Sequence, residues 1–527
     1  MAFDPAAPTQ PELEKIVGAF AGPNTRKITD YLNGFQLGPQ RSTAIVDAGG
    51  KVTLPDSALD ISYWTGDLLA ETDRHYTRQV KAIRRSFTFR NILLEGLELL
   101  ADGIGADEAD WSITLSRPLE EDEQPSETEA ALITEVEGLL TGWWDARDLP
   151  GLIQRAVVNA LAHRRQPVRP RIPDRFRDKQ GRLMKRETAR SLDPLWFVLP
   201  DVADAGIHLD AVTLERYAVT RVWLDDTGLK SRWEISHLND QEQTVIRTVD
   251  ETGGVSEPST PLGLGGQLWL LELTMPRGMV TPDALSQQDA RNVASTALNR
   301  NTRHAVFEKT IFVGMVPPLD DAGNPRPLSG PGSESWLSPM EMGELEETGQ
   351  LDANGDPITI TRSRLYPNAS ITKLDPAEPR AIQAALDQAT ADLYGILRQQ
   401  FMLIAGDATA SGRSRETSTG PYLRAVARCA TSVEAFIRDL LTFAMRVSAL
   451  VQGQPERYAG LRPVVSLHQK IFEPSPETLT TWLALHERNI ISTQTMRTLA
   501  GVADPDAEQQ LIDRETARAD PEPAPTT

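Results

Sequence analysis

The chain has 527 residues, of which 40% are hydrophobic and 24% charged, and its formal net charge at pH 7 is −20. This length predicts about two to four domains of roughly 100–200 residues each. The acidic balance argues against tight, general binding of nucleic acid, although it permits passing contact with DNA. No apolar run approaches the ~20 residues of a membrane helix, and the N-terminus carries no signal region, so we expect a soluble protein kept in a cytoplasm. The single cysteine, Cys429, excludes an internal disulfide and is expected to be a core thiol.

The N-terminal part of the chain combines irregular and helical patterns. Residues 1–60 are rich in Pro and Gly with short apolar pieces, which predicts an irregular N-terminal arm. A helical pattern then runs from about residue 67 to residue 103, and an apolar helix face runs from Trp143 to His163. We expect these helices to belong to a domain that extends to residue 281.

Charge reverses locally between residues 164 and 190. This segment holds eleven Lys or Arg against three acids, and its three prolines exclude a continuous helix. It is therefore predicted to be a basic extended loop. The candidates for contact with nucleic acid or an acidic partner surface are Arg164, Arg165, Arg169, Arg171, Arg175 and Arg177. The alternative is a solvated loop, or a patch that neutralises an acidic neighbour.

A β-rich section follows the basic segment. Stretches 216–224, 229–238 and 243–249 alternate in strand fashion and are separated by turn signals, which predicts an antiparallel meander. After a glycine-rich turn, residues 268–275 predict one more strand. The glycines lack a following Gly-Lys-Ser/Thr, so they do not indicate a phosphate-binding loop.

Two predicted helices enclose an insertion. The helix at 282–309 is rich in Gln, Asn, Ser and Thr, which suits a crowded polar subunit interface better than the core of a monomer. Residues 310–375 are rich in Gly, Pro and acids and hint at a small hairpin near 358–365. The second helix, at 376–403, carries an apolar stripe with helical spacing.

The longest predicted helix covers 419–452. Its apolar residues recur every three or four positions over about seven turns, Pro421 lies in the expected first turn, and Gly453 ends it. A loop of small residues at 404–418 joins it to the preceding helix, and the candidate site residues in this loop are Gly406, Asp407, Thr409, Ser411, Gly412, Arg413, Ser414 and Arg415. The plainest interpretation is a helical hairpin with a flexible connector. Residues 453–527 predict a short strand, three helices and an unordered end.

The order of these parts resembles the portal proteins of tailed bacteriophages, of the siphophage type. The helices at 282–309 and 376–403 resemble the two stem helices that flank a clip. The loop at 404–418 and the helix after it resemble the tunnel loop and the helix that crosses the wing. The third pattern resembles the last helices of the family and consists of IFEPSP (471–476), NIISTQT (489–495) and LAGVADPDAE (499–508).

The resemblance implies an α+β, mostly α, fold with the architecture of a phage portal. Its parts are an arm (1–60), a wing with the β-meander (61–281), stem helix 1 (282–309), a small α/β clip (310–375), stem helix 2 (376–403), the tunnel loop (404–418), the long wing helix (419–452) and a helical C-terminal crown with a disordered tail (453–527).

The resemblance also implies a function without catalysis. Portal proteins form homo-oligomeric rings of about twelve copies at one capsid vertex of the virion. Double-stranded DNA passes through the central channel during packaging and ejection. The implied partners are further copies of the chain, the major capsid protein, the terminase large subunit and a head-tail adaptor, with no membrane and no cofactor. The tunnel loop is expected to line the channel.

Catalytic motifs are not evident in the sequence. There is no Gly-x-x-x-x-Gly-Lys-Ser/Thr, and the seven histidines show no metal-ligand spacing. Acidic pairs such as Asp225 and Asp226 lie in predicted turns. We therefore expect no enzyme, no catalytic residue and no metal site. Two alternatives stay open, namely a metal-dependent hydrolase or nuclease, and another virion structural protein such as an adaptor or scaffold.

Overall fold

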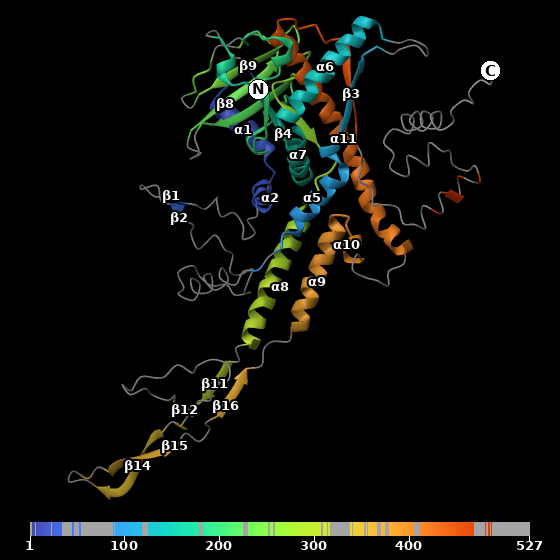
Figure 1. Ribbon diagram of the computed structural model, residues 1–527. Helices are drawn as coiled ribbons and strands as arrows, with labels where there is room; N and C mark the ends of the chain where they lie inside the picture. The colour runs from blue at the N-terminus through green and yellow to red at the C-terminus, as the bar shows by residue number, and fades with distance from the viewer. Residues whose placement is uncertain are drawn as a thin grey trace. The chain divides into compact units, whose positions relative to one another are not determined.

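The computed structural model combines α-helices and β-sheets, and about half of its residues are helical (Figure 1). It describes residues 3–33, 45–46, 52–53, 88–117, 125–178, 183–224, 230–306, 309–316, 338–351, 355, 357–374, 379–404 and 412–467, with gaps of one to four residues within some ranges, and a few positions between 480 and 488. Two compact units emerge. The first comprises Met1–Leu54, Asn91–Gln288 and Ala391–Thr527, and the second Pro55–Arg90 and Asp289–Thr390.

The first unit is built around helix α11 (Gly412–Gln452). The buried face of α11 includes Val433, Ile437 and Leu440, whose side chains are completely covered. It packs against α5 (Ile92–Ile104), α6 (Glu127–Ala146) and the strand pair formed by β3 (Asp110–Leu115) and β17 (Leu461–Ser466). Each fully buried Leu or Ile on this face contributes roughly 1.5–3 kcal/mol of transfer free energy.

The helices around α11 begin and end at recognisable signals. In α6, Ser126 and Glu129 form a capping box, in which each side chain accepts a hydrogen bond from the backbone amide of the other residue. In α5, the Asn91 side chain accepts a hydrogen bond from the Leu94 amide, and Gly105 ends the helix in the left-handed conformation. Helix α7 (Leu149–His163) then packs against α5 and buries an apolar face.

A three-stranded sheet lies next to these helices. Its order is β10–β4–β5, with β10 (Leu271–Thr274), β4 (Arg165–Arg171) and β5 (Trp196–Val198) all antiparallel to their neighbours. Val168 of β4 is fully buried in the same core as the helices. Side chains alternate along a strand, so the arginines of β4 point to the opposite side from Val168.

The predicted meander is confirmed as part of a four-stranded antiparallel sheet. The strands run in the order β6 (Ala205–Leu209), β7 (Arg216–Trp223), β8 (Ser231–Leu238) and β9 (Thr244–Val249). Strand β6 was not predicted from the sequence. The predicted strand at 268–275 exists as β10, but it pairs with β4 in the other sheet rather than with the meander.

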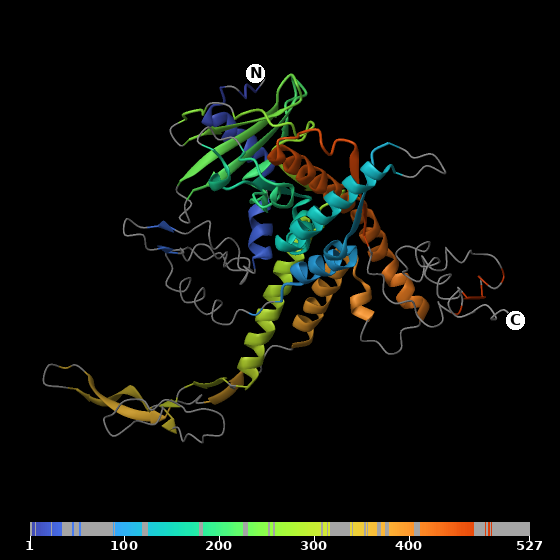
Figure 2. The ribbon, with the colours of Figure 1, turned by 45° about the horizontal axis from the view of Figure 1, so that its top comes forward.

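The N-terminal arm is more regular than expected. Helix α1 (Gln10–Phe20) starts at a capping box between Thr9 and Glu12 and packs on β6 and β7 (Figure 2). Leu13 of α1 is completely buried with Tyr217 and Trp233 of the sheet. The expectation of an irregular arm for residues 1–60 is therefore wrong for this stretch, because a single amphipathic face suffices to dock a helix on a sheet. The other short elements here are α2 (Thr25–Leu32), β1 (Ile45–Val46) and β2 (Val52–Thr53).

The second unit contains the insertion between the two helices. Helix α8 (Pro282–Val306) leads into β11 (Lys309–Val313), and β16 (Ser370–Leu374) precedes α9 (Pro379–Ile396). Strands β11 and β16 pair antiparallel. The predicted hairpin is confirmed as β14 (Glu341–Leu351) with β15 (Pro357–Leu365), and β12 (Met315–Val316) pairs with β13 (Ser338–Pro339).

The polar residues of α8 have partners within the chain. Arg291 donates from Nε to Thr390 Oγ1 of α9 at 3.2 Å and from Nη1 to the Arg90 carbonyl at 3.3 Å. Thr296 Oγ1 accepts from the Thr88 amide at 3.1 Å, and Asn299 donates to Thr88 Oγ1 at 2.6 Å. Part of the polar face that we assigned to a subunit interface thus lies inside the second unit.

Several predicted elements lie outside the described residues. This holds for most of the helix expected at 67–103, of which α5 is the described part, and for the three C-terminal helices and the unordered end. Cys429 is buried with 4% of its surface exposed, as expected, and burial raises the pKa of its thiol. Among the described residues, no helix combines the length and the apolar character needed to cross a membrane.

His163 at the end of α7 makes stability depend on pH. Burial, with a further effect of Arg165, lowers the pKa of His163 to about 4 from 6.5. Between these two values the unfolded chain binds a proton that the folded chain does not bind. The free energy of unfolding should therefore fall as the pH drops from about 6.5 to 4, by up to about 3 kcal/mol. Urea denaturation of wild type and His163→Gln at pH 7 and pH 4.5 checks this, because the variant should lose less stability; equal losses would contradict it.

Candidate functional site

The predicted tunnel loop lies only partly within the described residues. Gly406, Asp407, Thr409 and Ser411 fall outside them. Gly412, Arg413, Ser414 and Arg415 form the first turn of α11, so the helix begins at Gly412 and not at residue 419 as expected. Pro421 lies inside the helix instead of in its first turn. A proline removes one backbone hydrogen bond, and α11 continues through it because the following turns are fixed by buried packing.

The chain contacts α5 at a common base both before and after this loop. We call Leu397, Gln399, Phe401 and Tyr422 the loop base. The fully buried Gln399 donates from Nε2 to the Gly96 carbonyl of α5 at 2.6 Å. Tyr422 donates its hydroxyl to the Leu99 carbonyl at 2.8 Å, and its ring meets Phe401 of α10 (Phe401–Ile404) edge-on at 5.2 Å. The residues before and after the loop are therefore held together.

Two glycines of α5 make this close approach possible. A Cβ atom at Gly96 would lie 2.5 Å from Leu397 Cδ1 and 2.9 Å from Gln399 Oε1. A Cβ atom at Gly103 would collide with the Tyr422 hydroxyl and lie 3.2 Å from Val426 Cγ2. Gly96 and Gly103 are two turns apart and thus lie on one face of α5. Burial raises the pKa of Tyr422 to about 12, so its hydroxyl stays a donor at neutral pH.

Two of the six candidate arginines of the basic segment bind carboxylates inside the first unit. Arg169 makes two hydrogen bonds to Glu234 of β8, at 3.0 and 2.7 Å, and both side chains are only 11% exposed. Arg165 pairs with Glu272 of β10 at 3.1 Å and donates to the Val202 carbonyl at 2.7 Å. The Arg169–Glu234 pair joins the two sheets, whereas Arg165 and Glu272 lie on neighbouring strands of one sheet. Both pairs match the alternative in which the segment neutralises an acidic neighbour.

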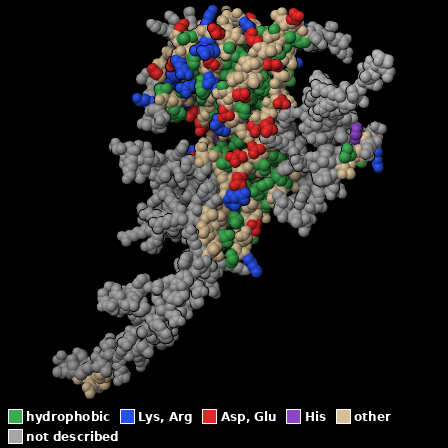
Figure 3. Space-filling model, in the orientation of Figure 1, with side chains coloured by type: hydrophobic (Ala, Val, Ile, Leu, Met, Phe, Trp, Pro, Cys, Tyr) green, Lys and Arg blue, Asp and Glu red, His purple; other side chains and the backbone are tan. Residues whose placement is uncertain are grey.

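The other four candidate arginines are spread over different local structures. Arg164 ends α7 with a left-handed φ of 72°, and Arg171 is exposed at the end of β4. Arg175 stacks on Phe176 with its guanidinium 4.9 Å from the ring centroid, and Arg177 forms an isolated bridge with Leu183. The segment is therefore a strand followed by turns. On the face shown in Figure 3, Lys and Arg side chains gather over the end of the unit that holds the four-stranded sheet.

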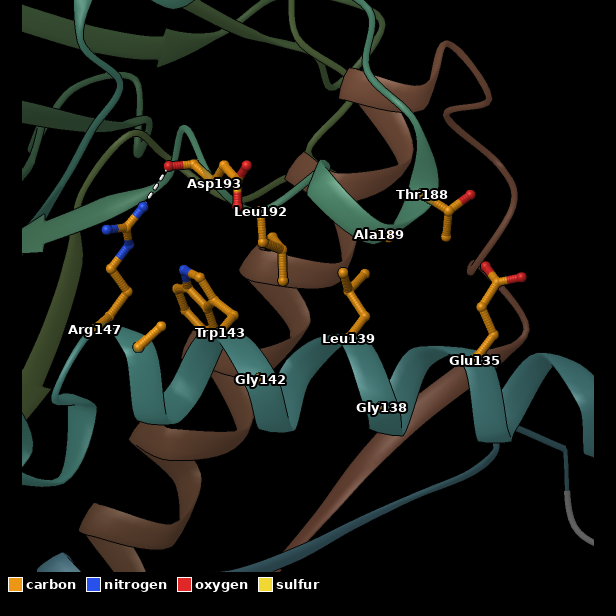
Figure 4. Close-up of a pocket in the computed structure, with 11 residues that line it drawn as sticks. Glu135, Gly138, Leu139, Gly142, Trp143, Arg147, Thr188, Ala189, Leu192 and Asp193 are labelled. Carbon is orange, nitrogen blue, oxygen red and sulfur yellow. Dashed lines mark hydrogen bonds between the residues drawn. The ribbon is translucent and has the colours of Figure 1, made fainter.

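A cavity of about 680 Å³ lies along α6 (Figure 4). Gly138 and Gly142 form one wall, and the segment around Leu192 and Asp193 forms the other. Arg147 closes one end, with its guanidinium 3.7 Å from the Trp196 ring centroid and a hydrogen bond to the Asp193 carbonyl.

The two acids of this cavity are already engaged. Glu135 accepts hydrogen bonds from Arg457 and Tyr458, both at 2.7 Å. Asp193 pairs with Arg186 at 3.3 Å. The cavity therefore has room for a small ligand, but both acids of its described lining already have partners.

No family model matches the sequence, and no curated protein matches it significantly. Within the described residues there is also no group of three or more His, Cys, Asp or Glu side chains that could hold a metal ion.

The loop base could not be predicted from the sequence, because its contacts join residues that are far apart in the chain. Gln399 and Gly96 are separated by 303 residues, and no local pattern links them. The only local signal is the pair of glycines in an otherwise apolar helical pattern at 92–104. Glycine inside a helix lowers its stability relative to alanine, so two glycines there indicate a close contact.

Proposed function

We propose that this chain is the subunit of a portal-like ring that provides a channel for double-stranded DNA at one vertex of a viral capsid. In this proposal α8 and α9 are the stem helices, the strands β11 to β16 are the clip, and the four-stranded sheet with α11 belongs to the wing. The predicted tunnel loop at 404–418, whose residues from Gly412 on belong to α11, faces the channel. The terminase large subunit and then a head-tail adaptor would dock on the ring, and the major capsid protein would surround it.

One observation carries the proposal, namely the order of elements from α8 to α11. A 25-residue helix enters an insertion whose first and last strands pair with each other, and an 18-residue helix leaves it. Because β11 pairs with β16, the last residues of α8 and the first residues of α9 are joined through this β-structure. A short segment and the 41-residue helix α11 then follow.

The loop base supports a constriction in the channel. A loop that narrows a channel must move at its tip while its ends stay fixed. Gln399 before the loop and Tyr422 further along α11 donate hydrogen bonds to carbonyls of α5, and the small residues at 405–411 leave no large apolar group to be exposed. The net charge of −20 per chain also favours slippage of DNA over tight binding.

Electron microscopy of the purified full-length protein at moderate salt tests the proposal. We expect end-on views of rings with an axial hole and about twelve-fold symmetry. The number of copies in a ring is read directly from the symmetry of the end-on averages. Compact monomers or dimers over a range of protein concentrations would contradict the proposal. In that case metal-dependent hydrolysis of DNA becomes the next activity to assay.

A further inference from the structure

A small pocket of the first unit is lined by four arginines. The turn before α8 contributes Arg277, the turn between α9 and α10 contributes Arg398, and α11 contributes Arg424 and Arg428. The pocket holds about 90 Å³. Its other lining residues are Pro, Met, Ala and Cys, so no carboxylate of the described residues lines it. We call this site the arginine pocket.

The four guanidinium groups have no counter-charge in the described part of the chain. All four residues are exposed, and within the described ranges none of their side chains makes an ion pair or a hydrogen bond. Other arginines of the same unit do find carboxylates or carbonyls, as seen for Arg165, Arg169, Arg446 and Arg457. The arginines of the pocket therefore differ from these other arginines of the unit, whose side chains have acceptors within the chain.

This arrangement works against the stability of the free chain. Arg424 and Arg428 are one turn apart on α11, and like charges at that spacing repel each other. Arg398 has a φ of 60°, in the left-handed region that disfavours every residue with a Cβ atom. The chain holds 74 acids against 54 Lys and Arg, and yet only bases converge here. A ligand with negative charge would remove the repulsion.

We propose that the arginine pocket binds a phosphate group. Guanidinium groups present paired N–H donors that match two oxygens of a phosphate, and several of them from different directions suit a tetrahedral anion. The cavity has room for a few water molecules or one such anion, but not for a base or a sugar. The rest of the ligand must lie outside, as in a phosphodiester backbone or free phosphate. Ring assembly is not required, because one chain supplies all four arginines.

Binding measurements on the full-length protein test this proposal. Inorganic phosphate is titrated by calorimetry, and a labelled DNA duplex is followed by fluorescence anisotropy at several salt concentrations. We expect Arg424→Glu/Arg428→Glu to weaken phosphate binding by at least about tenfold. If the backbone of DNA is the source, the same variant weakens duplex binding and reduces the salt slope by about two. If free phosphate is the source, duplex binding is unaffected. Both results support the site.

The matched control is Arg438→Glu/Arg462→Glu, which makes the same change of charge on α11 and β17 at exposed positions away from the pocket. It should leave phosphate binding unchanged. Arg424→Lys/Arg428→Lys keeps the charge, removes the paired donors and should weaken binding less than the Glu variant. It also serves as the test if circular dichroism shows that the Glu variant does not fold.

Three results would overturn the proposal. The first is a wild type that binds neither phosphate nor the duplex. The second is a control variant that loses as much affinity as the pocket variant. The third is a Glu variant that retains phosphate binding but changes its sedimentation, which would show that the pocket receives carboxylates of a second copy.

Discussion

Arg169→Met is expected to lower the free energy of unfolding by about 3–5 kcal/mol. The Glu234 side chain is only 11% exposed, and the substitution removes the two hydrogen bonds that its carboxylate accepts from Arg169. A buried charge that loses its partner keeps its desolvation cost, so the loss exceeds the net contribution of the pair. Urea denaturation followed by tryptophan fluorescence measures it, since Trp233 and Trp269 lie in this part of the unit.

A double substitution separates the pair from its surroundings. Arg169→Met/Glu234→Met removes both charges and should recover most of the stability lost in the single variant, because an apolar pair of similar volume has no desolvation cost. The control is Arg117→Met, whose pair with Glu129 is 45% and 31% exposed and should contribute less than about 1 kcal/mol. An Arg169→Met variant as stable as the control would show that the two sheets do not depend on this pair.

This result bears on the basic segment as a candidate nucleic-acid contact. A loss of DNA packaging in an Arg169 variant would reflect unfolding and not a missing phosphate contact. Arg171 is the informative position, because it lies two residues further along β4 and is exposed. The functional hypothesis for the segment should therefore be examined at Arg171.

The sequence predicted elements whose signals are local. The meander was recognisable because Trp233 and Ile235 of β8 alternate with polar residues, and α11 because its apolar residues repeat with helical spacing over many turns. Helix α1 was missed, although Leu13, Ile16 and Val17 have helical spacing and Thr9 with Glu12 forms a capping box. The prolines around it masked the pattern.

Pairing between distant segments could not be predicted in the same way. Strand β10 has the composition of a meander strand, but Leu271 pairs with Val168 of β4, more than a hundred residues earlier. The charge count of the basic segment was correct, yet it could not show that Arg165 and Arg169 point inward to acids of other strands. The arginine pocket likewise joins three segments, each of which shows only one or two ordinary surface arginines.

The loop base leads to the second large effect, a loss of stability in Gly103→Ala. The new methyl group would collide with the Tyr422 hydroxyl and lie 3.0 Å from its Cζ atom. Either Tyr422 moves and loses its hydrogen bond to the Leu99 carbonyl, or α5 and α11 separate. We expect the free energy of unfolding to fall by about 1–3 kcal/mol, as for other additions to a packed core.

Gly138→Ala is the matched control, because a Cβ atom at Gly138 of α6 meets nothing within 4 Å. There the same substitution should raise the free energy of unfolding by about 0.5–1 kcal/mol through helix propensity alone. The opposite signs test the close contact and not the residue type. Gly103→Ala/Tyr422→Phe should recover part of the loss, since the double variant lacks the colliding oxygen. A Gly103→Ala variant that is as stable as Gly138→Ala would mean that Tyr422 is not fixed to α5, and the chain after the tunnel loop would then lack this contact with α5.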